Sequence, residues 1–184
     1  MAHELPQFDP KRSAHRGGHG GARGQGHSGG HGGGMGPDRA QRHHDDQADF
    51  HALLKYHDQI SRSVTNTPDG IVAETRSDDP AIAALIRKHA HAMHARMVEK
   101  WGLRHWDPAF AEIFAQADKV ELVLQDLPDG VRAVERSDDP NVAILIRAHG
   151  AVVSAFVNGG AKVAAQESPL PEAYIRMAGS SPVG

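Results

Sequence analysis

Two histidines occupy matching positions in two similar stretches of the chain. His89 lies within Ile82–Met97, and His149 lies within Val142–Phe156. Wound at about 100° per residue, each stretch places its apolar side chains on one helical face, with the histidine at the centre. An imidazole in that setting could bind a transition metal or haem iron, transfer a proton, or act as a buried hydrogen-bonding group. The sequence leaves these three interpretations open.

The first stretch also contains other donors that suit soft metals. Met93 follows His89 by one helical turn, and His94 lies on the flank of the same face. Imidazole together with thioether suits copper or a haem iron with mixed ligands. His51 and His57 flank an earlier amphipathic segment and could join His94 in a cluster. The predicted ligands for copper, zinc or nickel are His89, His149, His94, His57 and His51. The predicted haem-contacting residues are His89, His149 and Met93.

Two carboxylates recur at the same spacing as the histidines. Asp58 and Asp118 precede the two predicted hairpins. A ligating imidazole commonly donates its second nitrogen to a carboxylate, so these two would orient His89 and His149 around a ligand. Without a ligand they would be the hydrogen-bond partners of imidazoles that cost about 1–3 kcal/mol each if left unpaired. A metal shared by the two histidines requires nearest nitrogens about 4 Å apart.

These recurrences belong to an internal repeat. The spacing of 60 residues that separates His89 from His149 also aligns Pro68-Asp69-Gly70 with Pro128-Asp129-Gly130, without a gap. Each copy predicts a short helix, a strand, a Pro-Asp-Gly hairpin turn with glycine at positive φ, a return strand and a long helix. The predicted fold is α+β: a duplicated αββα unit forming a four-stranded antiparallel sheet, with two long helices on one face and a pseudo-twofold axis.

The starts of the long helices carry further repeated residues. Asp79-Pro80 and Asp139-Pro140 predict an N-cap followed by proline in the first turn. Arg87 and Arg147 fall on the solvent side of the predicted helices, where we expect them to pair with acidic residues.

The first quarter of the chain differs in composition from the rest. Residues 1–46 are rich in glycine and histidine and predict a disordered tail that would hold Ni²⁺, Cu²⁺ or Zn²⁺ loosely. Asp46 or Asp49 is expected to cap the helix that follows. The predicted boundaries are 1–46 for the tail, 47–165 for the α+β domain with copies at 48–100 and 108–160, and 166–184 for a C-terminal extension.

Composition excludes several classes of function. A net charge of −3 gives no basic field for nucleic acid, and the absence of cysteine removes disulfides and thiolate sites. The sequence contains no uninterrupted apolar run of membrane-spanning length and no signal peptide at its start. We therefore expect no membrane span; the location stays open, with the cytoplasm as the default. Phosphate-binding loops, serine nucleophile elbows and His-Glu-x-x-His motifs are missing, which argues against an enzyme. A homodimer remains open.

Five short motifs resemble those of an uncharacterised family of bacterial proteins that are often exported. They are Phe50-His51-x-Leu-Leu-x-x-His57, Pro68-Asp69-Gly70, Ser77-Asp78-Asp79-Pro80, Trp106-Asp107-Pro108-x-Phe110 and Ser154-x-Phe156-Val157. The resemblance covers residues 50–160 and implies a bacterial tandem-repeat protein, but it transfers no activity and no catalytic residue. We therefore expect a non-enzymatic protein that binds a transition metal or haem. The alternative is a structural or protein-interaction module with the histidines in a buried hydrogen-bond network.

Overall fold

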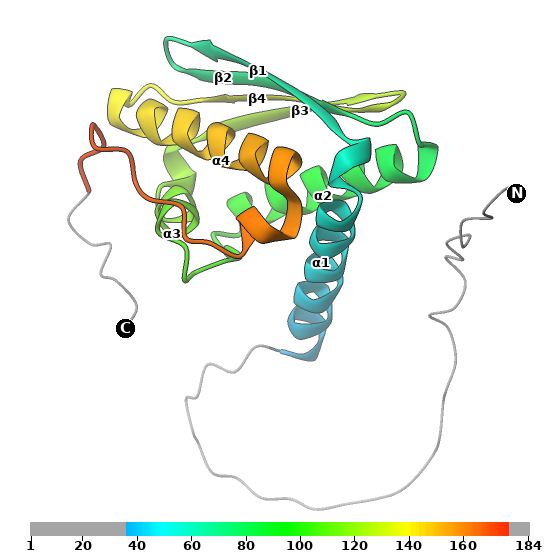
Figure 1. The fold of residues 1–184 in the computed structure, drawn as a ribbon. Coiled ribbons are helices and arrows are strands. Elements are labelled where there is room, and N and C mark those ends of the chain that lie inside the picture. The colour runs from blue at the N-terminus through cyan, green and yellow to red at the C-terminus, as the bar shows by residue number, and fades with distance from the viewer. Residues whose placement is uncertain (1–35, 177–184) are drawn as a thin grey trace, which may run out of the picture. The chain divides into compact units, whose positions relative to one another are not determined.

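A four-stranded antiparallel sheet carries all of the helices on one face in the computed structural model, which describes residues 36–176 (Figure 1). The strand order is β1-β2-β4-β3. The strands are β1 Ser61–Thr67, β2 Gly70–Arg76, β3 Glu121–Leu127 and β4 Gly130–Arg136. The helices are α1 Pro37–Lys55, α2 Pro80–Val98, α3 Pro108–Ala115 and α4 Pro140–Ala164, with 3₁₀ turns η1 His57–Gln59 and η2 Ala117–Lys119. The predicted α+β class and its antiparallel sheet are confirmed.

The two halves of the sheet meet in a symmetric register. Ala73 of β2 pairs with Ala133 of β4 at the centre, and Gly70 and Gly130 each lie opposite an arginine at the two ends. The strands and the starts of the long helices recur at a spacing of 60 residues. Helix α2 packs mainly against β4, and α4 packs mainly against β2. Each long helix therefore covers the inner strand of the other half, and the two halves share one core.

Gly70 and Gly130 are needed for this close central pairing. A Cβ atom on Gly70 would lie 1.9 Å from the carbonyl oxygen of Glu135, and one on Gly130 would lie 2.0 Å from that of Thr75. Neither glycine has a positive φ. The prediction that each turn requires glycine for a positive φ is wrong. Glycine is required because the neighbouring strand leaves no room for a side chain.

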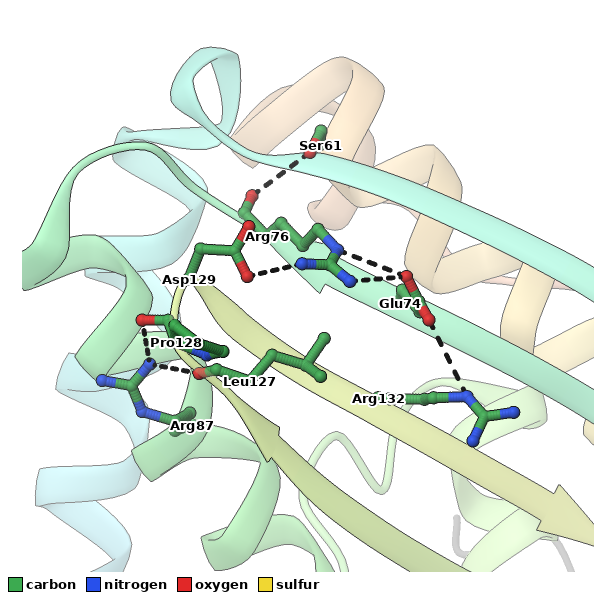
Figure 2. Close-up of polar contacts among 8 residues, drawn as sticks. All are labelled: Ser61, Glu74, Arg76, Arg87, Leu127, Pro128, Asp129 and Arg132. Carbon is green, nitrogen blue, oxygen red and sulfur yellow. Dashed lines mark hydrogen bonds and ion pairs between the residues drawn. The ribbon is translucent and has the colours of Figure 1, made fainter.

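Reciprocal arginine contacts join the halves at both hairpin turns. Arg87 of α2 donates to the carbonyl oxygens of Leu127 and Pro128, at 2.9 and 3.1 Å (Figure 2). Arg147 of α4 makes the same two bonds to the turn of the first half, at 3.0 and 3.2 Å. The expectation that these arginines pair with acids is wrong. The pseudo-twofold arrangement brings a turn with unpaired carbonyl groups to each guanidinium instead.

The face of the sheet away from the helices carries ion pairs. Arg76 bonds both Asp129, at 2.5 Å, and Glu74, at 2.9 Å, and Glu74 also lies 3.7 Å from Arg132 (Figure 2). These side chains are a third or more exposed, so each pair adds little stability. This face is therefore a solvated surface.

Helix α1 begins earlier than the sequence suggested. It starts at Pro37 and runs through both Asp46 and Asp49, so neither residue is an N-cap. Asp46 is buried and accepts a hydrogen bond of 2.6 Å from the Nε of Arg96, which is 1% exposed and lies 4.0 Å over the ring of Trp101. The predicted domain boundary after residue 46 is wrong, because residues 37–46 supply the partner of a buried cation. Residues 1–35, the rest of the predicted tail, lie outside the described residues.

Helices α2 and α4 begin where the sequence predicted them to begin. Asp79 accepts hydrogen bonds from the backbone at the start of α2, and Asp139 does so at the start of α4, which confirms both N-caps. After α4 the chain returns across α3, where the buried Tyr174 hydroxyl donates to Glu112 at 2.7 Å.

Among the described residues, α4 alone has the length and apolar composition of a membrane span. Core helices meet the same criteria, and α4 buries Val142, Leu145, Ile146 and Phe156 in this fold. The expected absence of a membrane span stays a prediction.

Candidate functional site

His89 projects from the middle of α2 toward α1. Its imidazole stacks on Phe50, with ring centroids 5.8 Å apart and planes inclined by 23°. The Nδ1 atom is shielded from solvent and has no hydrogen-bond partner among residues 36–176. Burial lowers the pKa of His89 from 6.5 to about 4, although the Asp49 and Asp46 carboxylates act in the opposite direction. The imidazole is therefore uncharged at neutral pH.

His149 repeats this arrangement on α4. Its ring meets Phe110 of α3 edge-on, with centroids 4.9 Å apart and an interplanar angle of 78°. Its Nδ1 is likewise shielded and unpaired within the described residues. Burial, and after it the positive charge of Arg62, lowers the pKa of His149 to about 4. The two copies thus hold equivalent neutral imidazoles against equivalent phenylalanines.

A third phenylalanine links the two sites. Phe156 of α4 lies 6.1 Å from Phe50 and 5.8 Å from Phe110, the latter pair being nearly parallel at 3°. We call Phe50, Phe110 and Phe156 the phenylalanine cluster. Ring contacts connect His89 to His149 only through this cluster in the described part of the chain. The position equivalent to Phe156 in α2 is Arg96, so the two copies differ at this cluster.

Arg104 covers one side of the phenylalanine cluster. Its guanidinium carbon lies 5.1 Å from the ring centre of Phe110 and 5.0 Å from that of Phe156. It donates to Asp107 at 2.8 Å and to the carbonyl oxygen of Ala164 at 2.7 Å. A fixed cation therefore lies beside the aromatic rings, where cation–π attraction adds to its ion pair.

His57 has a separate contact at the end of α4. Its Nδ1 donates to the carbonyl oxygen of Val157 at 2.8 Å. The helix is interrupted at Gly160, where φ is 58°, and a Cβ there would lie 2.4 Å from the His57 ring. The break leaves a helical carbonyl group to be satisfied from outside, and His57 satisfies it. The position of the His57 side chain is therefore explained by these contacts, without a bound ligand.

The predicted cluster of His51, His57 and His94 is wrong. His51 is exposed and His94 is half-buried, and neither has a hydrogen bond among the described residues. No three histidine or acidic side chains within residues 36–176 lie close enough together to hold a metal ion. Met93 is half-buried on α2, one turn after His89. The extra donors of the first copy are thus spread along α1 and α2 because their helical phases differ.

Asp58 and Asp118 do not pair with the histidines. Both are exposed, in η1 and η2, and Asp118 lies 3.2 Å from the ammonium group of Lys100. That hydrogen bond holds the pKa of the Asp118 carboxyl below its usual range. The predicted pairing is wrong because these turns point their carboxylates outward, whereas each Nδ1 faces the interior.

Two charged residues of the helix-facing side escaped the sequence interpretation. Arg62 of β1 donates to Thr75 Oγ1 at 2.7 Å, and burial lowers its pKa. Burial raises the pKa of Glu135 on β4 to about 7, although the charge of Arg62 opposes the increase. Strand alternation could have identified both, since each falls at an inward position of its strand.

Comparison with known proteins gives no relative: neither a protein-family model, nor a curated protein, nor a solved structure matches this chain. The resemblance to a bacterial repeat family therefore stays a prediction.

Proposed function

We propose that this domain is a non-enzymatic haem-binding protein that uses His149 or His89 as an axial ligand. The observation that carries the proposal is the pair of neutral imidazoles with unpaired nitrogens at equivalent sites beside the phenylalanine cluster. A neutral imidazole can bind iron without first losing a proton. Because an unpaired buried nitrogen costs about 1–3 kcal/mol, a ligand that pairs with it would offset that cost.

Haem suits this arrangement better than a bare metal ion. A bare ion needs three or four protein donors, and no such group occurs in the described residues. Haem iron brings its own in-plane nitrogens and needs only one or two axial side chains. Aromatic rings of the kind in the phenylalanine cluster pack well against a porphyrin, and Arg104 places a positive charge beside them.

Two features lower the expected affinity for haem. A haem-ligating histidine usually donates its second nitrogen to a carbonyl or carboxylate group, and neither His89 nor His149 makes such a bond. Entry of a porphyrin also requires the phenylalanine cluster to separate. Both features weaken binding, so we expect an affinity below that of a preformed haem pocket.

The test is a titration of the full chain with haemin, followed by the Soret absorption band. His89→Ala, His149→Ala and the double variant are compared with His91→Ala, which alters an exposed histidine bonded to Asp126 at 2.8 Å. The proposal predicts a shifted Soret band that the double variant loses and His91→Ala keeps. A parent protein that leaves the haemin spectrum unchanged would refute it, as would a double variant that binds like the parent.

The alternative is a protein-interaction module in which the histidines only pack against aromatic rings. The observation that favours it is the full set of ring contacts already made by each imidazole. Calorimetric titrations with Cu²⁺, Zn²⁺ and Ni²⁺ distinguish it from the original metal hypothesis. If the parent and the double variant bind these metal ions equally, the metal lies on other histidines of the chain. The interaction module would then be the better explanation of His89 and His149.

A further inference from the structure

The two edges of the sheet are equivalent in fold but differ in charge. Arg62 is the only charged residue of the edge strand β1, and its side chain turns under the sheet to bond Thr75 at 2.7 Å. The other edge strand, β3, carries Glu121 and Asp126. Charged side chains on an edge strand prevent it from pairing with other strands. Strand β1 lacks this protection over its full length.

A groove accompanies the unprotected edge. It lies between β1 and α4 and has a volume of about 410 Å³. Val64 and Asn66 line it on the strand. The helix side is lined by the small residues Ala151, Ser154 and Ala155, with Arg147 and Asn158 at its two ends along α4. Val64 is 36% exposed although it lies on the helix-facing side of the sheet. The inner side of this edge is therefore incompletely covered by its own chain.

The equivalent region under β3 is occupied. His91 of α2 stands at the position equivalent to Ala151, and Asp126 stands at that of Asn66. These two side chains are joined by a hydrogen bond of 2.8 Å. The groove thus marks a difference between two copies that otherwise fold alike.

The backbone of β1 also has free hydrogen-bonding groups. The hairpin is closed by two residues between Thr67 and Gly70, which pair directly. In an antiparallel pair of strands, successive residues direct their backbone N–H and C=O groups alternately toward and away from the partner strand. Arg62, Val64 and Asn66 therefore direct these groups away from β2. Within residues 36–176 no strand lies on that side (Figure 1). An extended strand is the kind of partner that can form hydrogen bonds with all of these free backbone groups.

We propose that two copies of this chain associate through β1, paired antiparallel about Val64, to form one continuous sheet. A twofold axis at Val64 places that residue opposite its own copy and places Arg62 opposite Asn66. No like charges then lie opposite each other along the paired strands, and the exposed Val64 side chains cover each other. Both α4 helices lie on the same side of the joined sheet, where Ala151 and Ala155 leave room for the partner.

The experiment is sedimentation velocity of the full chain across the micromolar range. Val64→Lys places two ammonium groups together on the axis and should convert dimer to monomer. Val123→Lys places a lysine on the other edge strand, β3, at a 51% exposed position on the face away from the helices, and should leave the dimer intact. Circular dichroism checks that both variants are folded.

A second variant keeps the proposal testable if Val64→Lys does not fold. Val64→Pro removes only the outward N–H group, and proline is tolerated at such edge positions. It too should give a monomer. A parent chain that is monomeric throughout the range would overturn the proposal, including the case in which β1 binds a strand of some other protein. Dimerisation that survives both Val64 changes, or that Val123→Lys also abolishes, would overturn it equally.

Discussion

The half-buried imidazoles of His89 and His149, whose Nδ1 atoms are shielded from solvent, make the stability of this domain dependent on pH. Each has a pKa lowered from 6.5 to about 4 in the fold, so the unfolded chain binds protons more readily than the native one. For a group whose pKa falls on folding, the stabilisation is fully present above the unfolded pKa and is lost as the pH falls. The window for this loss therefore runs from just above pH 6.5 down to about pH 4.

The size of the effect follows from these values. At about pH 5 each histidine should have removed about 2 kcal/mol from the free energy of unfolding, and the two together about 4 kcal/mol. This is a large part of the roughly 5–15 kcal/mol that stabilises a typical domain. Glu135 acts in the opposite direction: its pKa is raised to about 7, so its contribution increases as the pH falls. A comparison between variants is needed because the parent curve contains both effects.

The assay is urea unfolding of the parent, His89→Leu and His149→Leu at about pH 8 and about pH 5. Glu135 contributes equally to all three proteins and cancels in the difference. Each leucine variant should be more stable relative to the parent at about pH 5 than at about pH 8, by about 2 kcal/mol. His91→Leu is the matched control, and its change should be much smaller because that imidazole is exposed in the native state. Equal pH dependence in the parent and both leucine variants would refute the reasoning.

Four further substitutions test contacts of the fold. Arg87→Met and Arg147→Met should each lower the free energy of unfolding by about 1–3 kcal/mol in urea titrations, because each leaves two turn carbonyl groups without a donor. Asp46→Ala should cost about 3–5 kcal/mol in the same assay by leaving Arg96 buried without its partner, and a loss under about 1 kcal/mol would contradict the buried ion pair. Gly160→Ala should lower the melting temperature, because the positive φ and the short contact both oppose a Cβ; an unchanged melting temperature would contradict the helix break.

The repeat made the fold largely predictable from sequence. Strand alternation, the Pro-Asp-Gly turns and the Asp-Pro helix starts are local signals. Because each occurs once in each copy, they predict two hairpins and hence a four-stranded antiparallel sheet. The start of α1 was missed because Asp46 has no local apolar pattern around it. Asp46 is held in the fold by its hydrogen bond from Arg96, which lies 50 residues away in sequence.

The candidate site was predictable only in part. Helical phase correctly placed His89 and His149 on inward faces, because that placement depends on one helix alone. Their neighbours depend on how four helices pack, and sequence spacing does not determine it. Asp58 and Asp118 are thus repeated and close in sequence to the site, yet they point outward, whereas Phe50 and Phe110 form the actual contacts.

The repeat separates the residues that the fold explains from those that it does not. Ser77 and Ser137 are buried in both copies, and each hydroxyl accepts a bond from the backbone two residues later. Arg87 and Arg147 are repeated because each closes the turn of the other half. The repeated histidines are different, because in both copies a shielded nitrogen lacks a partner within the described residues. An apolar residue at these two positions would avoid that cost, so the retention of imidazole in both copies favours a role outside the packing of the fold. The haemin titration of the double histidine variant is therefore more informative about these positions than any stability measurement.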